Sequence, residues 1–159
     1  MKKITFIILI GIFTSGCSKV NQDKVTFDPA KEKEKVALVL EKYVIANEEQ
    51  NLNLIKEVWA TNPDIVVIGT NSNETLIGWE AIKNALKRQF ETIEDTYISV
   101  RDQRIEINDT GNTSWFSEIV NYNYIYQGKP VKYEGLRFTG VLEKINGDWF
   151  IVQSHMSIP

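Results

Sequence analysis

The sequence has few of the side chains that build metal centres and covalent frameworks. Its 159 residues include one cysteine and one histidine. A single cysteine excludes a disulfide framework and a cysteine-based zinc site, and a single histidine excludes a multi-histidine metal centre. We therefore expect neither a metal ion nor a cofactor.

The chain also lacks a surplus of basic residues and a long apolar run. Its 18 Lys and Arg are outnumbered by 21 Asp and Glu, for a net charge of −3. Binding to nucleic acid needs a basic surplus on one face, so no nucleic acid is expected as a partner. No apolar run reaches the roughly 18 residues of a membrane-spanning helix, which excludes a polytopic membrane protein. With 43% hydrophobic and 25% charged residues, the composition is that of one globular domain.

The first 16 residues are typical of a secretory signal peptide. The basic start Met1-Lys2-Lys3 is followed by an apolar run, Ile4 to Phe13, in which Thr5 is the one polar residue. Small residues, Thr14-Ser15-Gly16, then lead to Cys17. This arrangement resembles a bacterial lipoprotein signal, in which cleavage falls before the cysteine and its thiol receives a lipid. We predict lipidation of Cys17; a plain signal peptide with a chance cysteine is the alternative.

The lipoprotein interpretation divides the chain into three parts. Residues 1–16 are the expected signal peptide, residues 17–27 the lipidated cysteine and a polar tether, and residues 28–159 the folded domain. Acyl chains contribute about 0.8 kcal/mol per buried methylene, so several chains on one cysteine hold a domain at a bilayer. The expected location is extracytoplasmic, with the lipid in a bacterial membrane, at the outer membrane or the cell surface.

Helical signals gather in the first half of the domain. Asp28-Pro29 is typical of a helix start, and apolar residues then recur at three- and four-residue spacing to about residue 49. A short second helix from residue 52 must end before Asn62-Pro63, because the residue before proline avoids the helical conformation. A strand at residues 65–68 and a third helix from Trp79 complete this half.

The second half has the pattern of a sheet. We expect strands near residues 96–107, 113–127, 130–145 and 149–157. Asn146-Gly147 is typical of a two-residue hairpin turn, since both positions need positive φ, and Gly128-Lys129 is expected to form a similar turn. Helices followed by antiparallel strands predict an α+β fold, with three N-terminal helices on one face of a curved antiparallel sheet.

The order of these elements resembles the SnoaL-like domains of the nuclear transport factor 2-like superfamily. The segments that carry the resemblance are Asn62-Pro63-Asp64-Ile65-Val66-Val67-Ile68-Gly69, Ile77-Gly78-Trp79-Glu80-Ala81-Ile82, Ser114-Trp115-Phe116 and the stretch from Leu136 to Ser157. The resemblance covers about residues 30–157 and implies a cone-shaped fold with a pocket beneath the helices. The superfamily includes isomerases, dehydratases, cyclases and non-catalytic domains, so it implies no single reaction.

The two expected hairpin turns fix a register for the last three strands. They place Thr139 opposite Glu118 and Arg137 opposite Val120. Alternation then puts Glu118 and Arg137 on one face and His155 on the other. The Glu118–Arg137 pair would either orient a polar ligand or form an ion pair without a ligand role.

The candidate site residues follow from this register and from the resemblance. Two aromatic side chains from the helices would look down onto the sheet in the resembled fold. With the sheet residues they form the expected ligand-binding set, which is Tyr43, Trp59, Glu118, Tyr122 and Arg137. The candidates for acid–base catalysis are Glu118 and His155, because His155 is the only imidazole in the chain.

The sequence leaves three functional classes open. The leading hypothesis is a lipid-anchored domain that binds a small, partly apolar molecule in a cone-shaped pocket. The first alternative is an isomerase, dehydratase or cyclase that uses Glu118 or His155. The second alternative is a non-catalytic dimerisation module. A homodimer is expected because Trp115, Phe138, Trp149 and Ile151 would otherwise form an exposed apolar patch on one sheet face.

Overall fold

The computed structural model describes residues 27–71 and 73–159. In chain order the elements are α1 (Pro29–Glu48), α2 (Leu52–Val58), β1 (Val66–Ile68), β2 (Thr75–Ile77), α3 (Trp79–Phe90), β3 (Ile93–Ile107), β4 (Thr113–Tyr126), β5 (Lys129–Ile145) and β6 (Asp148–Ser157). The expected signal peptide, Cys17 and the tether up to residue 26 lie outside the described residues. Within the described ranges, no helix has the length and apolar character needed to cross a membrane.

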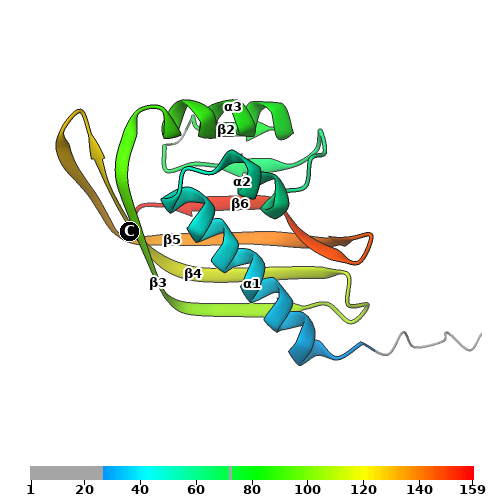
Figure 1. The fold of residues 1–159 in the computed structure, drawn as a ribbon. Coiled ribbons are helices and arrows are strands. Elements are labelled where there is room, and N and C mark those ends of the chain that lie inside the picture. The colour runs from blue at the N-terminus through cyan, green and yellow to red at the C-terminus, as the bar shows by residue number, and fades with distance from the viewer. Residues whose placement is uncertain (1–26, 72) are drawn as a thin grey trace, which may run out of the picture.

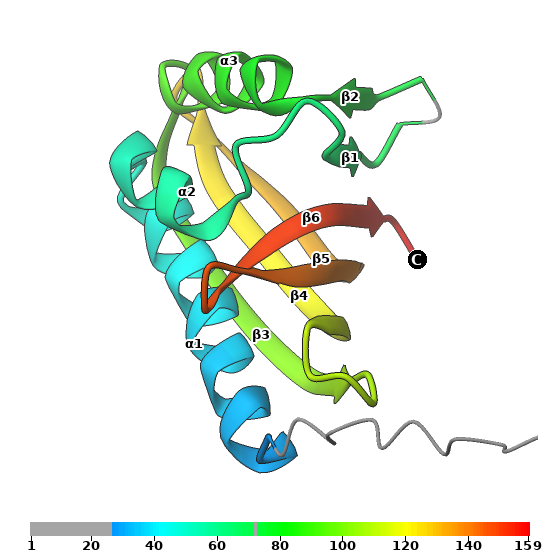
Figure 2. The same cartoon turned by 90° about the vertical axis from the view of Figure 1, so that its right-hand side faces the viewer.

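One curved sheet of six strands carries all three helices on the same side (Figures 1 and 2). The strand order is β2-β1-β6-β5-β4-β3. The predicted α+β class and the three helices are confirmed. The sheet is mixed rather than wholly antiparallel, because β1 runs parallel to β6. The short strand β2 was not predicted; it pairs with β1 at the edge of the sheet.

The helix starts follow from the capping residues in the sequence. Asp28 Oδ1 accepts hydrogen bonds from the backbone N–H groups of Ala30, at 3.0 Å, and Lys31, at 3.4 Å. Asn51 caps α2 in the same way, accepting from Leu54 N at 3.2 Å. Both caps satisfy N–H groups that have no partner within their own helix. The predicted helix start at Asp28-Pro29 is therefore confirmed.

The hairpin turns agree with the sequence at one of the two places. Ile145 pairs with Asp148, so Asn146-Gly147 is a two-residue turn with positive φ at both positions, as predicted. The other turn is Gln127-Gly128, one residue earlier than the predicted Gly128-Lys129. Gln127 and Gly128 are the two residues with positive φ, whereas Lys129 is already part of β5.

A bulge in β5 changes the register expected between β4 and β5. Tyr122 pairs with Tyr133 but Val120 pairs with Leu136, so β5 contains one extra residue. Gly135, with φ of +71°, lies in this bulge, and its N–H donates to Asn121 Oδ1 at 2.9 Å. An extra residue moves every following side chain to the opposite face.

The predicted pairing of Glu118 and Arg137 on one face is therefore wrong. Phe138 stands opposite Glu118, and Arg137 stands opposite Ile119. Alternation places Arg137 and Glu118 on opposite faces of the sheet. Arg137 is exposed, and its Nη2 donates to the carbonyl oxygen of Ile158 at 2.7 Å.

A second irregularity lies in β6. It lets residues before and after it turn their side chains to the same, inner face of the sheet. Leu142 pairs with Ile151 whereas Val141 pairs with Gln153, so β6 carries the extra residue there. Ile151 and Ser154 are both buried beneath the helices as a result. His155 lies on the outer face, opposite Thr139.

The apolar patch that motivated the homodimer prediction does not exist in the expected form. Phe138, Trp149 and Ile151 are core residues, at most 3% exposed, because the helices cover them. Of the four residues named for the patch, Trp115 is the one that reaches solvent, with half of its surface exposed. Phe138, Trp149 and Ile151 were thus wrongly predicted for the dimer face, whereas Trp115 is exposed on the outer face, and dimerisation itself stays a prediction.

Candidate functional site

A cavity of about 540 Å³ lies between the inner face of the sheet and the helices. Helices α1 and α3, Trp59 directly after α2, and all six strands contribute to its wall. Much of the wall is aliphatic or aromatic, including Val67, Leu76, Leu86, Leu136, Phe138 and Met156. A concave, mainly apolar cavity of this size suits a small organic molecule.

Tyrosine side chains form one wall of the cavity. Tyr122, Tyr124 and Tyr126 alternate along β4, and alternate strand residues share a face, so all three line the cavity with Tyr133 of β5. The ring of Tyr124 lies 5.9 Å from that of Tyr122 and 6.3 Å from that of Tyr133. Burial raises the pKa of Tyr122, with Tyr43 as a further cause, and burial also raises the pKa of Tyr124. These hydroxyls are therefore neutral at physiological pH and can donate or accept hydrogen bonds.

Two aromatic side chains reach the cavity from the helical layer. Tyr43 of α1 stacks on Phe138, with ring centroids 5.1 Å apart. Trp59, the residue after α2, is 2% exposed. Its Nε1–H is buried, and no acceptor in the described ranges bonds to it. Leaving a buried donor without an acceptor costs about 1–3 kcal/mol, so an acceptor that reached this N–H would add stability.

Polar groups of α3 and of the β1–β2 connection occupy other parts of the lining. Gln89 Nε2 lies 3.2 Å from Tyr122 Oη, where the amide donates to the hydroxyl. Arg88 and Glu74 also line the cavity and are exposed to solvent. In the part of the chain that the structure describes, no three His, Cys, Asp or Glu side chains are grouped so that they could hold a metal ion.

The structure gathers three of the five predicted ligand-binding residues at this cavity. Tyr43, Trp59 and Tyr122 line it, whereas Glu118 and Arg137 do not. Arg137 is excluded by the bulge at Gly135, which turns it to the outer face.

Glu118 occupies a different place from the one predicted. It is on the inner face and 3% exposed, and its Oε2 accepts a hydrogen bond from Gln103 Nε2 at 2.8 Å. Burial raises the pKa of the Glu118 carboxyl, and the hydrogen bond from Gln103 offsets part of that rise. The carboxyl therefore has an amide as its partner and not the expected Arg137.

Some lining residues were missed by the sequence analysis. Gln89 lies three residues after Leu86 on α3, so the helical period could have placed both on the buried side. The predicted register puts Leu136 and Phe138 on the face opposite Glu118, whereas both line the cavity on the inner face. Gly135 was the available signal, because an isolated glycine inside a strand often marks a bulge.

A cone of this kind, with three helices packed on one face of a curved sheet and a cavity between the two layers, defines the nuclear transport factor 2-like class of α+β folds. The family model of the SnoaL-like domain matches residues 36–159, and the chain belongs to this family. No curated protein sequence matches the chain.

Solved structures with the same fold are distant in sequence. An NTF2-like superfamily protein from Salmonella enterica serovar Typhimurium has 19% identity and a TM-score of 0.74, over 82% of this chain and 92% of that one. A proposed dehydratase of the NTF2-like family from Streptomyces avermitilis has 15% identity and a TM-score of 0.72, over 82% and 99% of the two chains. A proposed aromatic ring hydroxylase from Novosphingobium aromaticivorans has 12% identity and a TM-score of 0.74, over 83% and 92%. At these identities the likeness establishes the fold alone.

Proposed function

We propose that the domain binds a small, partly apolar organic molecule in the cavity between the sheet and the helices. The observation that carries the proposal is the cavity of about 540 Å³, whose mainly apolar wall includes Trp59, a residue with an unpaired indole N–H. Apolar contacts would supply most of the affinity, and a few polar groups would orient the molecule.

The polar groups of the wall indicate the chemistry of the ligand. Trp59 can only donate, so the group that meets it must be an acceptor such as a carbonyl oxygen. The neutral hydroxyls of Tyr122 and Tyr124 can bond to either a donor or an acceptor. The flat rings favour a ligand that is itself aromatic or alicyclic, because such rings stack or meet edge to face. We therefore expect a cyclic ketone or a related carbonyl compound.

The positions of Glu118 and His155 do not support acid–base catalysis by either residue in this cavity. His155 lies on the outer face, opposite Thr139, and Glu118 does not line the cavity. The activities named for the proposed dehydratase and the proposed hydroxylase are those of the two proteins, and we do not transfer them to this chain. Binding is therefore the function we propose.

The binding experiment compares matched ligands and matched variants. A set of cyclic ketones and the corresponding hydrocarbons would be titrated by calorimetry into the wild type, Trp59→Phe and Trp115→Phe. Trp59→Phe keeps an aromatic ring but removes the N–H, so the preference for the ketone should fall about tenfold, or about 1.4 kcal/mol. Trp115 lies away from the cavity and is half exposed, so its variant should keep the preference. Equal binding of ketone and hydrocarbon by the wild type would contradict the role of Trp59.

We also propose that the domain is held at the outside of a bacterial membrane by a lipid on Cys17. The support is the sequence pattern of residues 1–17.

Dimerisation through the outer face of the sheet is a further proposal. Its support is the half-exposed indole of Trp115 beside the partly buried side chain of Val141, its cross-strand partner, with Ile119 further along the same face of β4. Sedimentation at micromolar concentration would test it, with Trp115→Glu expected to shift the protein to monomer. A wild type that is monomeric at that concentration would contradict the proposal.

A further inference from the structure

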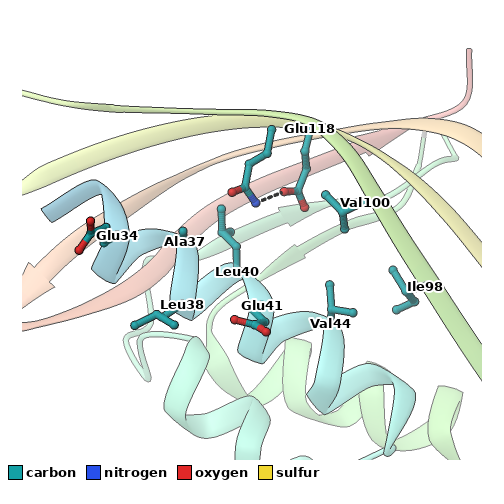
Figure 3. A pocket seen from close by; sticks show the side chains of 10 residues that line it. Glu34, Ala37, Leu38, Leu40, Glu41, Val44, Ile98, Val100 and Glu118 are labelled. Carbon is teal, nitrogen blue, oxygen red and sulfur yellow. Dashed lines mark hydrogen bonds between the residues drawn. The ribbon is translucent and has the colours of Figure 1, made fainter. Parts of the chain in front are cut away.

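A second hollow lies on the other side of α1, between that helix and strands β3 and β4 (Figure 3). It is an open groove of about 650 Å³. Much of its lining is apolar, with Ala37, Leu40 and Val44 on the helix and Ile98 and Val100 on β3. No residue lines both this groove and the cavity described above. We call it the α1–β3 groove.

Glu118 is the buried acid of the α1–β3 groove. In Figure 3 it extends from the sheet toward α1, above Leu40 and beside Val100. Its bond from Gln103 is to a neutral amide, and no Lys or Arg nitrogen of the described residues lies within 4.0 Å of its carboxyl oxygens. A buried carboxylate is costly unless a cation accompanies it. The groove thus holds an acidic group that, once ionised, has no ion-pair partner among the described residues.

The basic residues of α1 are already engaged elsewhere. All four lysines of the helix pair with other acids, namely Lys31 with Asp28 at 3.9 Å, Lys33 with Glu106 at 2.7 Å, Lys35 with Glu32 at 3.0 Å and Lys42 with Glu57 at 2.9 Å. Two further acids of α1, Glu34 and Glu41, line the groove and are exposed. Neither forms an ion pair with a described residue. The groove therefore combines an apolar wall with three carboxyl groups, none of which forms an ion pair with a described residue.

We infer that the α1–β3 groove binds a protonated primary amine that carries a short aliphatic chain. The ammonium group would meet the Glu118 carboxylate, which can accept a charge-assisted hydrogen bond on the oxygen not used by Gln103. The chain would lie against Leu38, Val44 and Val100, apolar lining residues that reach solvent. Glu34 and Glu41 at the rim would attract the cation and repel carboxylic acids of the same length. Such a ligand differs from the neutral carbonyl compound expected in the main cavity.

Three probes of equal length and different charge test the inference. Hexylammonium, hexanol and hexanoate would each be titrated into the full-length protein, with binding followed by calorimetry and by the backbone amide signals in NMR spectra. We expect hexylammonium to bind at least tenfold more tightly than hexanol, and hexanoate not to bind. The shifted amide signals should be those of Ala37, Leu40, Ile98 and Val100. If hexanol binds as tightly as hexylammonium, or if the shifts fall on Leu86 and Gln89 in the main cavity, the inference is wrong.

A matched pair of variants tests the role of Glu118. Glu118→Gln keeps the size of the side chain and removes its charge, so hexylammonium should bind at least tenfold more weakly. Glu143→Gln removes one exposed charge outside the groove and should leave binding within twofold. Equal loss in both variants, or no loss in Glu118→Gln, would overturn the assignment.

If Glu118→Gln folds poorly, the pH dependence of the affinity of the wild type for hexylammonium tests the same role. The groups that face Glu118 are Glu34, Glu41 and Tyr43 of α1 and Gln103 of β3. The amine stays protonated below pH 9, so affinity should rise with pH as Glu118 loses its proton. An affinity that does not change between pH 4 and pH 8 would contradict a carboxylate as the receiving group.

Discussion

Trp149 Nε1 donates a hydrogen bond to Glu32 Oε2 at 2.7 Å in the interior of the protein. The same carboxylate accepts from Lys144 at 2.6 Å and from Lys35 at 3.0 Å. Glu32 belongs to α1, whereas Trp149 and Lys144 belong to the β5–β6 hairpin. The interaction therefore fixes the helix that forms a wall of both the main cavity and the α1–β3 groove.

Removing the Glu32 charge should destabilise the protein in a pH-dependent way. Burial alone would raise the pKa of Glu32, but hydrogen bonds from Lys144, Trp149 and Lys35 outweigh it and lower the pKa to about 2. Because this pKa lies below that of the unfolded chain, the stabilisation is present above about pH 4.5 and is lost as the pH falls toward 2. Glu32→Gln should cost about 3 kcal/mol at pH 7, measured by urea denaturation.

The control for this variant is an exposed ion pair on α3. Glu80 pairs with Lys83 at 2.6 Å on the surface, and such pairs contribute less than about 1 kcal/mol. Glu80→Gln should therefore change stability little at any pH. If Glu32→Gln costs as much at pH 2.5 as at pH 7, its stabilisation is not electrostatic.

Glu118 should show the opposite pH dependence. Burial raises its pKa, so the folded protein favours the protonated carboxyl, and stability falls as the pH rises through the folded-state pKa. Glu118→Gln cannot ionise, so its melting temperature should increase relative to the wild type as the pH is raised from 4 to 8. A constant difference between the two proteins over that range would contradict the burial of an ionisable carboxyl.

Most of the fold could be predicted from the sequence because its signals are local. Asp28-Pro29, Asn62-Pro63 and Asn146-Gly147 restrict the backbone by capping, by steric exclusion and by positive φ. The bulges in β5 and β6 were not predicted, and each exchanges the two faces of a strand. Gly135 could have indicated the first bulge, whereas the second, at Val152, involves no residue type that marks a bulge.

The candidate site was predictable to the extent that it depends on helices rather than on strand register. Tyr43 and Trp59 reach the cavity from α1 and from the end of α2. Tyr122 lies between the bulge and the β4–β5 turn, so the extra residue does not change the sheet face to which its side chain points. Arg137 lies beyond the bulge and was assigned to the wrong face for that reason.

Arg137 should not contribute to binding in the main cavity. It lies on the outer face, where its guanidinium donates to the carbonyl oxygen of Ile158. Arg137→Ala should therefore leave the affinity for a ligand of the cavity within twofold, as measured by calorimetry. A tenfold loss with the fold intact would mean that the ligand binds to the outer face.

Attachment to the membrane should depend on Cys17. Cys17→Ser should prevent lipidation, and a protein that begins near Lys24 should be recovered in the soluble fraction and folded. Fractionation of cells that express the wild type and each variant measures this. If the shortened protein still sediments with membranes, a lipid on Cys17 is not what holds it there.

The most direct test of a ligand in the main cavity is the detection of contacts between ligand protons and methyl groups of the protein. With a cyclic ketone from the calorimetric titration, intermolecular nuclear Overhauser effects should reach the methyl groups of Leu86, Leu136 and Met156, which line the cavity. Effects confined to Ile119 and Val141, on the outer face, would contradict the proposed site.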